Sequence, residues 1–173
     1  MDSKSGVFYE KKVKSWGDCN MGFNVLAFLY TIGCCVVAMV IAGMSGSDED
    51  KEWFVNLNHP DNAFLLKIMN IVGIIFFSSF GFVLYHLFIK GDAAPIILAI
   101  LIILLMGLSP ALKYKTRNLK VFFLIMLLFP VLTVGLLWFL LPNDFVIAIP
   151  VIVFSLWLVY DLSYYYRLMQ LNR

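Results

Sequence analysis

Five long apolar runs constrain this chain more than any other feature of its sequence. They cover about residues 21–44, 66–89, 93–113, 119–141 and 144–167. Each run is close to the roughly 20 residues that a helix needs to cross the hydrocarbon core of a bilayer. Lipid offers the backbone no hydrogen-bond partners, so a spanning segment must be a helix or part of a closed barrel. The runs are continuously apolar rather than alternating, which favours helices.

Composition agrees with a chain that is solvated by lipid. Of its 173 residues, 62% are hydrophobic and 14% are charged, whereas a soluble domain has about 45–50% apolar and about 25% charged residues. The connections between runs are short, so consecutive helices should be antiparallel neighbours. We therefore predict an all-α integral membrane protein, in which a polar tail at residues 1–20 precedes one five-helix bundle at residues 21–173.

The charge and the cysteines exclude several kinds of partner. A net charge of +2 without an arginine-rich face argues against nucleic acid. Cys34 and Cys35 lie inside an apolar run, where cysteine acts as a small hydrophobe, and we expect no metal site. The first apolar run is too long for a cleavable signal peptide, so we expect it to stay in the mature protein as a spanning helix. The expected partner of the whole chain is the lipid bilayer. The flanking cations leave the orientation of the bundle open.

The longest connection, a lid-like loop at residues 45–65, has an unusual composition. It begins SGSDEDKE and continues into WFVNLNHP, residues 53–60. This second stretch resembles the W-Y-x-x-L-x-K-P element in the first loop of the TspO/MBR family, the tryptophan-rich sensory proteins related to the mitochondrial translocator protein. Phe54 replaces the family's tyrosine, and His59 replaces its lysine.

Further matches to the same family follow in the same order along the chain. LSPAL at residues 108–112 resembles its W-S-P-L-F-F, and residues 150–172, with Trp157, resemble its C-terminal ending. Gly81 stands where the family has the glycine of L-Y-x-x-M-G. The chain departs from the pattern at Phe64 and Leu65, which replace two prolines, and at Leu108, which replaces a tryptophan. The sequence therefore resembles a divergent member that lacks part of the family's aromatic lining.

The resemblance implies a TspO-like bundle with a ligand pocket among its helices. In the family the first loop closes one end of the bundle, and the ligands are flat hydrophobic molecules such as porphyrins, haem precursors or sterol-like lipids. Transport, sensing and sequestration are the roles expected for such binding. The candidate ligand-binding residues are Trp53, Phe54, Leu57, Pro60, Phe77, Gly81, Ser109, Pro110, Trp157 and Asp161.

Three of these residues have an alternative interpretation. Trp53 fits an interfacial anchor as well as the underside of a lid. Trp157, in the middle of the last apolar run, suits either a pocket wall or packing between helices. Asp161 follows Trp157 by one helical turn. An acid there either faces the interior, as a counter-charge or proton carrier, or lies hydrated at the membrane interface.

No motif indicates catalysis, so we predict a protein that is not an enzyme, with no catalytic or metal-binding residues and no required cofactor. A bound porphyrin or lipid is the expected ligand. One alternative is a structural or accessory subunit that acts through contacts with a partner membrane protein. A second is a porphyrin-modifying enzyme, which only the family resemblance suggests. A homodimer remains open, and we expect a prokaryotic cytoplasmic membrane because no targeting presequence is seen.

Overall fold

The computed structural model describes residues 24–43, 46–60 and 64–173, and in this part of the chain all regular structure is helical. The predicted tail at residues 1–20 lies outside the described residues, as do positions 44–45 and 61–63 of the predicted lid-like loop. The helices are α1 (Val25–Gly43), α2 (Asp48–Val55), α3 (Phe64–Lys90), α4 (Ala93–Thr116), α5 (Leu119–Met126), α6 (Leu128–Leu140) and α7 (Phe145–Leu171).

Five spans are long and apolar enough to cross a membrane, and α5 and α6 together form one of them. This finding confirms the prediction of an all-α protein with five spanning helices. The bounds of α1, α3 and α7 lie within a few residues of the predicted ones. The chain is therefore an integral, multi-pass membrane protein.

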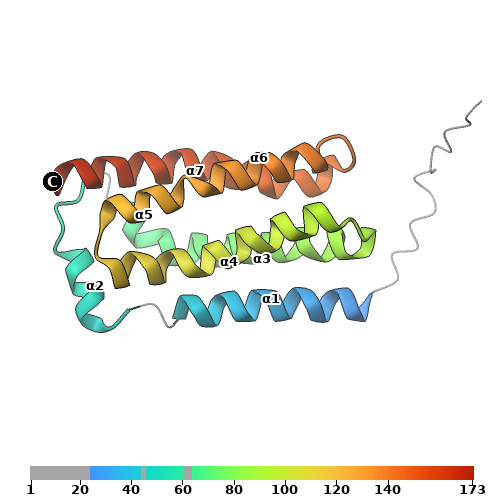
Figure 1. Ribbon diagram of the computed structural model, residues 1–173, viewed down its shortest axis with the longest axis horizontal. Coiled ribbons are helices and arrows are strands. Elements are labelled where there is room, and N and C mark those ends of the chain that lie inside the picture. The colour runs from blue at the N-terminus through green and yellow to red at the C-terminus, as the bar shows by residue number, and fades with distance from the viewer. Residues whose placement is uncertain (1–23, 44–45, 61–63) are drawn as a thin grey trace, which may run out of the picture.

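The spans run antiparallel to their neighbours in sequence (Figure 1). Helices α3, α4, α5–α6 and α7 pack in a ring, with each of them in contact with the next. Helix α1 lies outside this ring and, among the described elements, packs on α3 and α4 alone. Helix α2 lies across the end of the bundle where α7 ends and where the chain turns from α4 into α5 (Figure 1).

Aromatic side chains fill the middle of the ring. Phe154 of α7 contacts three phenylalanine rings, with centroids 4.9 Å away for Phe76, 5.0 Å for Phe80 and 5.9 Å for Phe129, all in edge-to-face geometry. Edge-to-face pairs of this kind are the favoured arrangement of buried aromatic rings. Because the three partners come from α3 and α6, this cluster joins both helices to α7 at the centre of the membrane-spanning region.

A proline explains why the fourth span consists of two helices. Pro130 has no N–H to donate, and its ring clashes with the carbonyl of the residue four positions earlier, Met126. Helix α5 ends at Met126, and α6 begins at Leu128. The sequence predicted one helix over residues 119–141, so the structure corrects it to two helices separated at Leu127.

Helix α1 approaches α4 closely at a glycine. A Cβ atom added to Gly107 would overlap the backbone carbonyl oxygen of Ala38 and would lie 3.0 Å from its Cα atom. The neighbouring atoms are backbone, so a side-chain rotation cannot relieve the overlap. Small residues that allow such close approach are a common means of packing helices in membranes.

We predict that Gly107→Ala separates α1 from α4 and destabilises the fold by about 2 kcal/mol, the cost typical of overpacking. The measurement is the midpoint of a denaturant titration of the purified protein in detergent micelles. Gly33→Ala is the matched control, because an added Cβ at Gly33 of α1 meets no atom within 4 Å. An equal effect of the two substitutions would contradict the close α1–α4 contact.

Candidate functional site

The segment between the first two spans contains a helix where the sequence predicted a lid-like loop. Helix α2 begins with a capping box: the N–H of Asp50 donates to the hydroxyl of Ser47, and the N–H of Ser47 donates to the Asp50 carboxylate at 3.0 Å. Two backbone donors are thereby satisfied reciprocally. The first turn also carries Asp48 and Glu49, whose negative charges are favourable at the positive end of a helix. We call residues 46–60 the lid segment.

Polar contacts fasten the lid segment to two other parts of the chain. The guanidinium of Arg117, in the turn between α4 and α5, donates to Asp50 at 2.7 and 3.0 Å. Asn58 and Asn172 form a reciprocal pair, in which each donates to an oxygen of the other at 2.9 and 3.0 Å. The lid segment therefore has anchors near both of its ends.

Phe54 points from α2 into the end of the bundle. It is 4% exposed, and its ring meets those of His59 and Tyr114 edge to face, at 5.3 and 6.1 Å. Trp53 and Leu57, the other predicted lid residues, are partly buried and pack against the same core. The three apolar side chains thus form the underside of the cover.

His59 links the lid segment to α7. Its Nε2 lies 2.9 Å from the carbonyl oxygen of Phe54 and its Nδ1 lies 2.8 Å from the hydroxyl of Tyr164. A carbonyl can only accept, so Nε2 carries the proton. In the neutral imidazole, Nδ1 then accepts from the Tyr164 hydroxyl. The sequence comparison treated His59 only as a replacement for the family's lysine, and the structure gives it this bridging position.

A buried cation lies beneath Phe54, and the sequence analysis missed it. Lys113 is 3% exposed, and its ammonium lies 4.0 Å from the centre of the Phe54 ring and 4.4 Å from that of Tyr114. The rings of Phe122 and Tyr165 are about 6 Å away. Such distances allow cation–π attraction. Lys113 is surrounded by aromatic rings rather than by water.

Lys113 escaped notice because a lysine at the end of an apolar run is usually a membrane flank. The sequence predicted that the third spanning helix ends at residue 113, but α4 continues to Thr116. Lys113 is therefore inside the helix and lies on the same helix face as Met106, two turns earlier. Met106 packs against the core. The register was a usable signal, since residues seven apart share a helix face.

Asp161 of α7 provides the opposite charge. It is 8% exposed and interacts electrostatically with Lys113, although the described ion pairs do not include a direct contact between the two groups. Of the two interpretations that the sequence left open for Asp161, the structure therefore supports the interior position. A charged side chain within the membrane costs free energy, so ionisable residues there usually pair with one another.

Trp157 lies at the edge of the ring, between α3 and α7. Its indole is partly buried and contacts Phe76 at 6.1 Å and Tyr160 at 5.6 Å. The contact with Phe76 is packing between helices, while the contact with Tyr160 extends an aromatic surface along α7. Both interpretations of Trp157 that the sequence offered remain compatible with this position.

A cavity of about 240 Å³ lies beside α7 at the lid end. Its described lining consists of Pro60, Tyr160, Ser163, Tyr164 and Arg167. Pro60 is the last residue of the lid segment, and the other four lining residues belong to the last part of α7. The cavity thus combines two aromatic rings with a guanidinium at the C-terminal end of the lid segment.

The remaining predicted site residues belong to α3 and α4. An added Cβ at Gly81 would lie 3.4 Å from the Cys35 sulfur of α1, so Gly81 serves helix packing. Pro110 lacks the N–H that would bond the carbonyl of Met106, and the Ser109 hydroxyl donates to that oxygen at 3.3 Å instead. Phe77 packs against the core from α3.

We predict that Lys113→Met destabilises the protein by about 3 kcal/mol, because it leaves Asp161 buried without its counter-charge. The double substitution Lys113→Met with Asp161→Leu should recover most of this loss, as replacing a whole buried pair is often nearly neutral. Denaturant titration in micelles measures both. Lys115→Met is the control, since Lys115 is exposed on the same helix. A double variant no more stable than Lys113→Met would contradict the coupling.

A second prediction concerns the pH at which the lid segment loosens. Hydrogen bonds from Arg117, and next from Ser47, hold the pKa of Asp50 below its ordinary value. The contribution of a lowered carboxyl pKa is present above the ordinary value and is lost as the pH falls through the lowered one. The fluorescence anisotropy of Trp53, in a variant whose other tryptophans are phenylalanine, should therefore fall below pH ~4.

Arg117→Gln removes the main cause of the shift in Asp50. It should move the transition of Trp53 anisotropy to higher pH without changing its direction. A transition at the same pH in both proteins would show that the contact between Asp50 and Arg117 does not hold the lid segment.

Comparisons with known proteins add no family to these findings. No family model matches the chain, and no curated protein or solved structure matches it. The resemblance to the TspO/MBR family accordingly remains a prediction from the quoted residues.

Proposed function

We propose that this protein binds flat, largely apolar molecules that carry an acidic group, at the lid end of its bundle. Porphyrins and haem precursors have this chemistry, and transport, sensing or sequestration would each use such binding. The observation that carries the proposal is the surface of α7 beside Pro60. There an aromatic strip ends in an arginine at a cavity.

The strip consists of Trp157, Tyr160, Tyr164 and Arg167. Their spacing of three or four residues puts them on one face of α7, and the Trp157 and Tyr160 rings are in contact. A flat conjugated ring gains stacking and burial against such a surface. Arg167 lies at the end of the span nearest the lid segment, where its planar guanidinium suits the carboxylate of an amphipathic ligand.

The size of the cavity argues for a ligand that enters from the lipid side. Small-molecule sites are typically ~300–1,000 Å³, and the cavity at Pro60 measures about 240 Å³. It would enclose only one edge of a tetrapyrrole, so the rest of the ring would lie along Trp157 and the surrounding lipid. The packed phenylalanines around Phe154 occupy the centre of the ring of helices. We therefore propose a binding surface on α7 under the lid segment rather than a site in the middle of the bundle.

Titration with protoporphyrin, followed by the shift in porphyrin absorbance, tests this function. Trp157→Leu should weaken binding about fivefold, because it removes one aromatic stacking contact. Arg167→Gln should weaken binding of the free acid roughly three- to tenfold by removing a charge-assisted bond at an exposed position. The same substitution should leave the affinity for the porphyrin dimethyl ester unchanged, since the ester has no carboxylate.

Trp138→Leu is the matched control for Trp157→Leu. Trp138 is 80% exposed and belongs to α6, away from the lid segment, so its loss should not change the affinity. Equal weakening by the two tryptophan substitutions would contradict the α7 site, and an absorbance shift that neither substitution changes would indicate partition of porphyrin into the micelle. An Arg167→Gln substitution that changes the affinity for the acid and for the ester by the same factor would also contradict the α7 site.

The same experiment separates the two alternative functions. An accessory subunit would bind no porphyrin and would co-purify with a defined membrane partner. A porphyrin-modifying enzyme would bleach the bound porphyrin in a reaction that depends on light or oxygen and on the protein. Stable, saturable binding without bleaching is the result expected for the proposed function.

A further inference from the structure

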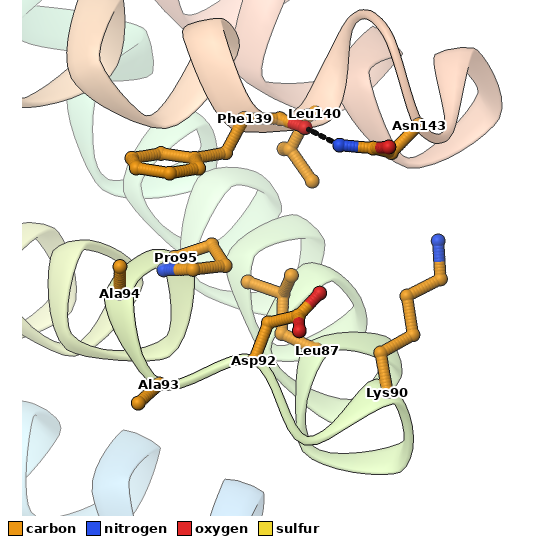
Figure 2. A pocket seen from close by; sticks show the side chains of 9 residues that line it. All are labelled: Leu87, Lys90, Asp92, Ala93, Ala94, Pro95, Phe139, Leu140 and Asn143. Atoms are coloured by element: carbon orange, nitrogen blue, oxygen red, sulfur yellow. Dashed lines mark hydrogen bonds between the residues drawn. The ribbon is translucent and has the colours of Figure 1, made fainter.

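A second cavity lies at the end of the bundle opposite the lid segment, between the α3–α4 turn and the end of α6 (Figure 2). Its volume is about 330 Å³, within the range of small-molecule sites. The residues that line it are Leu87, Lys90, Asp92, Ala93, Ala94, Pro95, Phe139, Leu140 and Asn143. No function described above uses this cavity.

The lining has an apolar side and a charged side. Figure 2 shows the Phe139 ring above Pro95 at one side, while the Asp92 carboxylate and the Lys90 ammonium both point towards the space between the start of α4 and the end of α6. Gly91 brings these two charges to the same opening. Its φ of +77° reverses the chain directly after α3, a conformation that glycine adopts without strain.

The Asp92 carboxylate is not used by the fold. Five helices in the described chain have a polar residue directly before their first residue, and in four of them (Asn24, Ser47, Asn118 and Asp144) the side chain accepts a backbone N–H. Asp92 makes no such cap bond. Nor does any hydrogen bond or ion pair among the described residues involve its carboxylate, which leaves its oxygens free to accept from a ligand.

Lys90 has a fixed position and spare donors. Its ammonium donates to Asp144 at 2.6 Å, and its side chain is 36% exposed. Partial burial raises the pKa of Asp144, but hydrogen bonds from Lys90 and the Ile147 N–H outweigh this effect and hold the pKa below its ordinary value. The ion pair is therefore intact at neutral pH. An ammonium has three donors, so Lys90 can also donate to an anionic ligand atom.

Asn143 adds a neutral acceptor to the same opening. Its amide nitrogen donates to the Phe139 carbonyl at 2.8 Å (Figure 2), which fixes the side chain and leaves the amide oxygen to accept. The cavity thus offers a free carboxylate, an amide oxygen, a cation and an aromatic ring. Acceptors of this kind suit an ammonium group, and the aromatic ring belongs to the apolar side of the cavity.

We propose that this cavity binds the headgroup of an ethanolamine phospholipid, with the ammonium on Asp92 and the phosphate on Lys90. A zwitterion with adjacent ammonium and phosphate matches the free acid and the cation that Gly91 places at one opening. The apolar side, formed by Leu87, Pro95, Phe139 and Leu140, continues onto the spanning helices. It would receive the glycerol and the first part of the acyl chains, which favours a membrane lipid over a soluble amine.

The test uses the full-length protein in micelles and native mass spectrometry with a series of lipids of identical acyl chains. Phosphatidylethanolamine should be retained as a one-to-one complex. Its N-trimethylated counterpart, which lacks N–H donors, and phosphatidylglycerol, which lacks the ammonium, should be retained several-fold less. Soluble phosphoethanolamine should bind much more weakly than the lipid, and equal binding would overturn the assignment to a lipid.

Asp92→Asn is the decisive variant, because no contact within the described fold depends on the Asp92 carboxylate. It should reduce retention of phosphatidylethanolamine about tenfold, the effect expected when a charged hydrogen-bond partner is removed. Glu49→Gln removes the same charge from α2 at the other end of the bundle and should change nothing. Unchanged retention in Asp92→Asn, or equal retention of all three headgroups by the unmodified protein, overturns the proposal.

Reversing the charge at residue 92 tests the same site a second time. Asp92→Lys should exchange the preference for phosphatidylethanolamine against one for phosphatidylglycerol, and a loss of all lipid selectivity would count against the cavity. Porphyrin binding at the lid end is measured separately, and its failure would not bear on this cavity. The two proposals can therefore fail independently.

Discussion

The absence of water from the bilayer core is the constraint on which the rest of this structure depends. Each spanning segment must satisfy its backbone groups internally, so each is helical. Where a proline removes a backbone N–H donor, either a side chain donates to the carbonyl left without a partner, or the helix ends. In α4 the Ser109 hydroxyl donates to the carbonyl that Pro110 leaves without its partner, and at Pro130 the fourth span divides into two helices. The Ser-Pro pair that suggested a ligand site thus has a structural role in the helix.

The same constraint explains why one end of the bundle needs a cover. Lys113 and Asp161 carry charges within spanning helices, where an uncompensated charge is costly. Phe54 closes over Lys113, and the contacts of Asp50 with Arg117 and of His59 with Tyr164 keep that cover in place. The first role of the lid segment is therefore structural: it covers the charged pair and allows both charges to lie inside the bundle. A ligand surface on the neighbouring face of α7 would be a second use of the same arrangement.

Residue patterns predicted some parts of this site and missed others for identifiable reasons. Ser47 and Asp50 stand three residues apart, the spacing of a capping box, yet α2 was not predicted because its polar composition resembles a loop. Lys113 was assigned to a flank because its neighbours Lys115 and Arg117 are flanking charges. Phe54 was predicted as an inward-facing residue, but the cation that it covers was not.

The sequence by itself determined the number of spans and their approximate ranges, because hydrophobic length is a local property that each segment carries without reference to the others. It also indicated that Phe54 and Asp161 were unusual for their positions. Only the tertiary structure decided which polar side chains face the interior. Facing depends on the register of each helix against its neighbours. Gly107 of α4 meets the backbone of Ala38, which directs the Gly107 face of α4 towards α1. Lys113 lies on a different face of the same helix and is thereby directed to the aromatic rings at the end of the bundle.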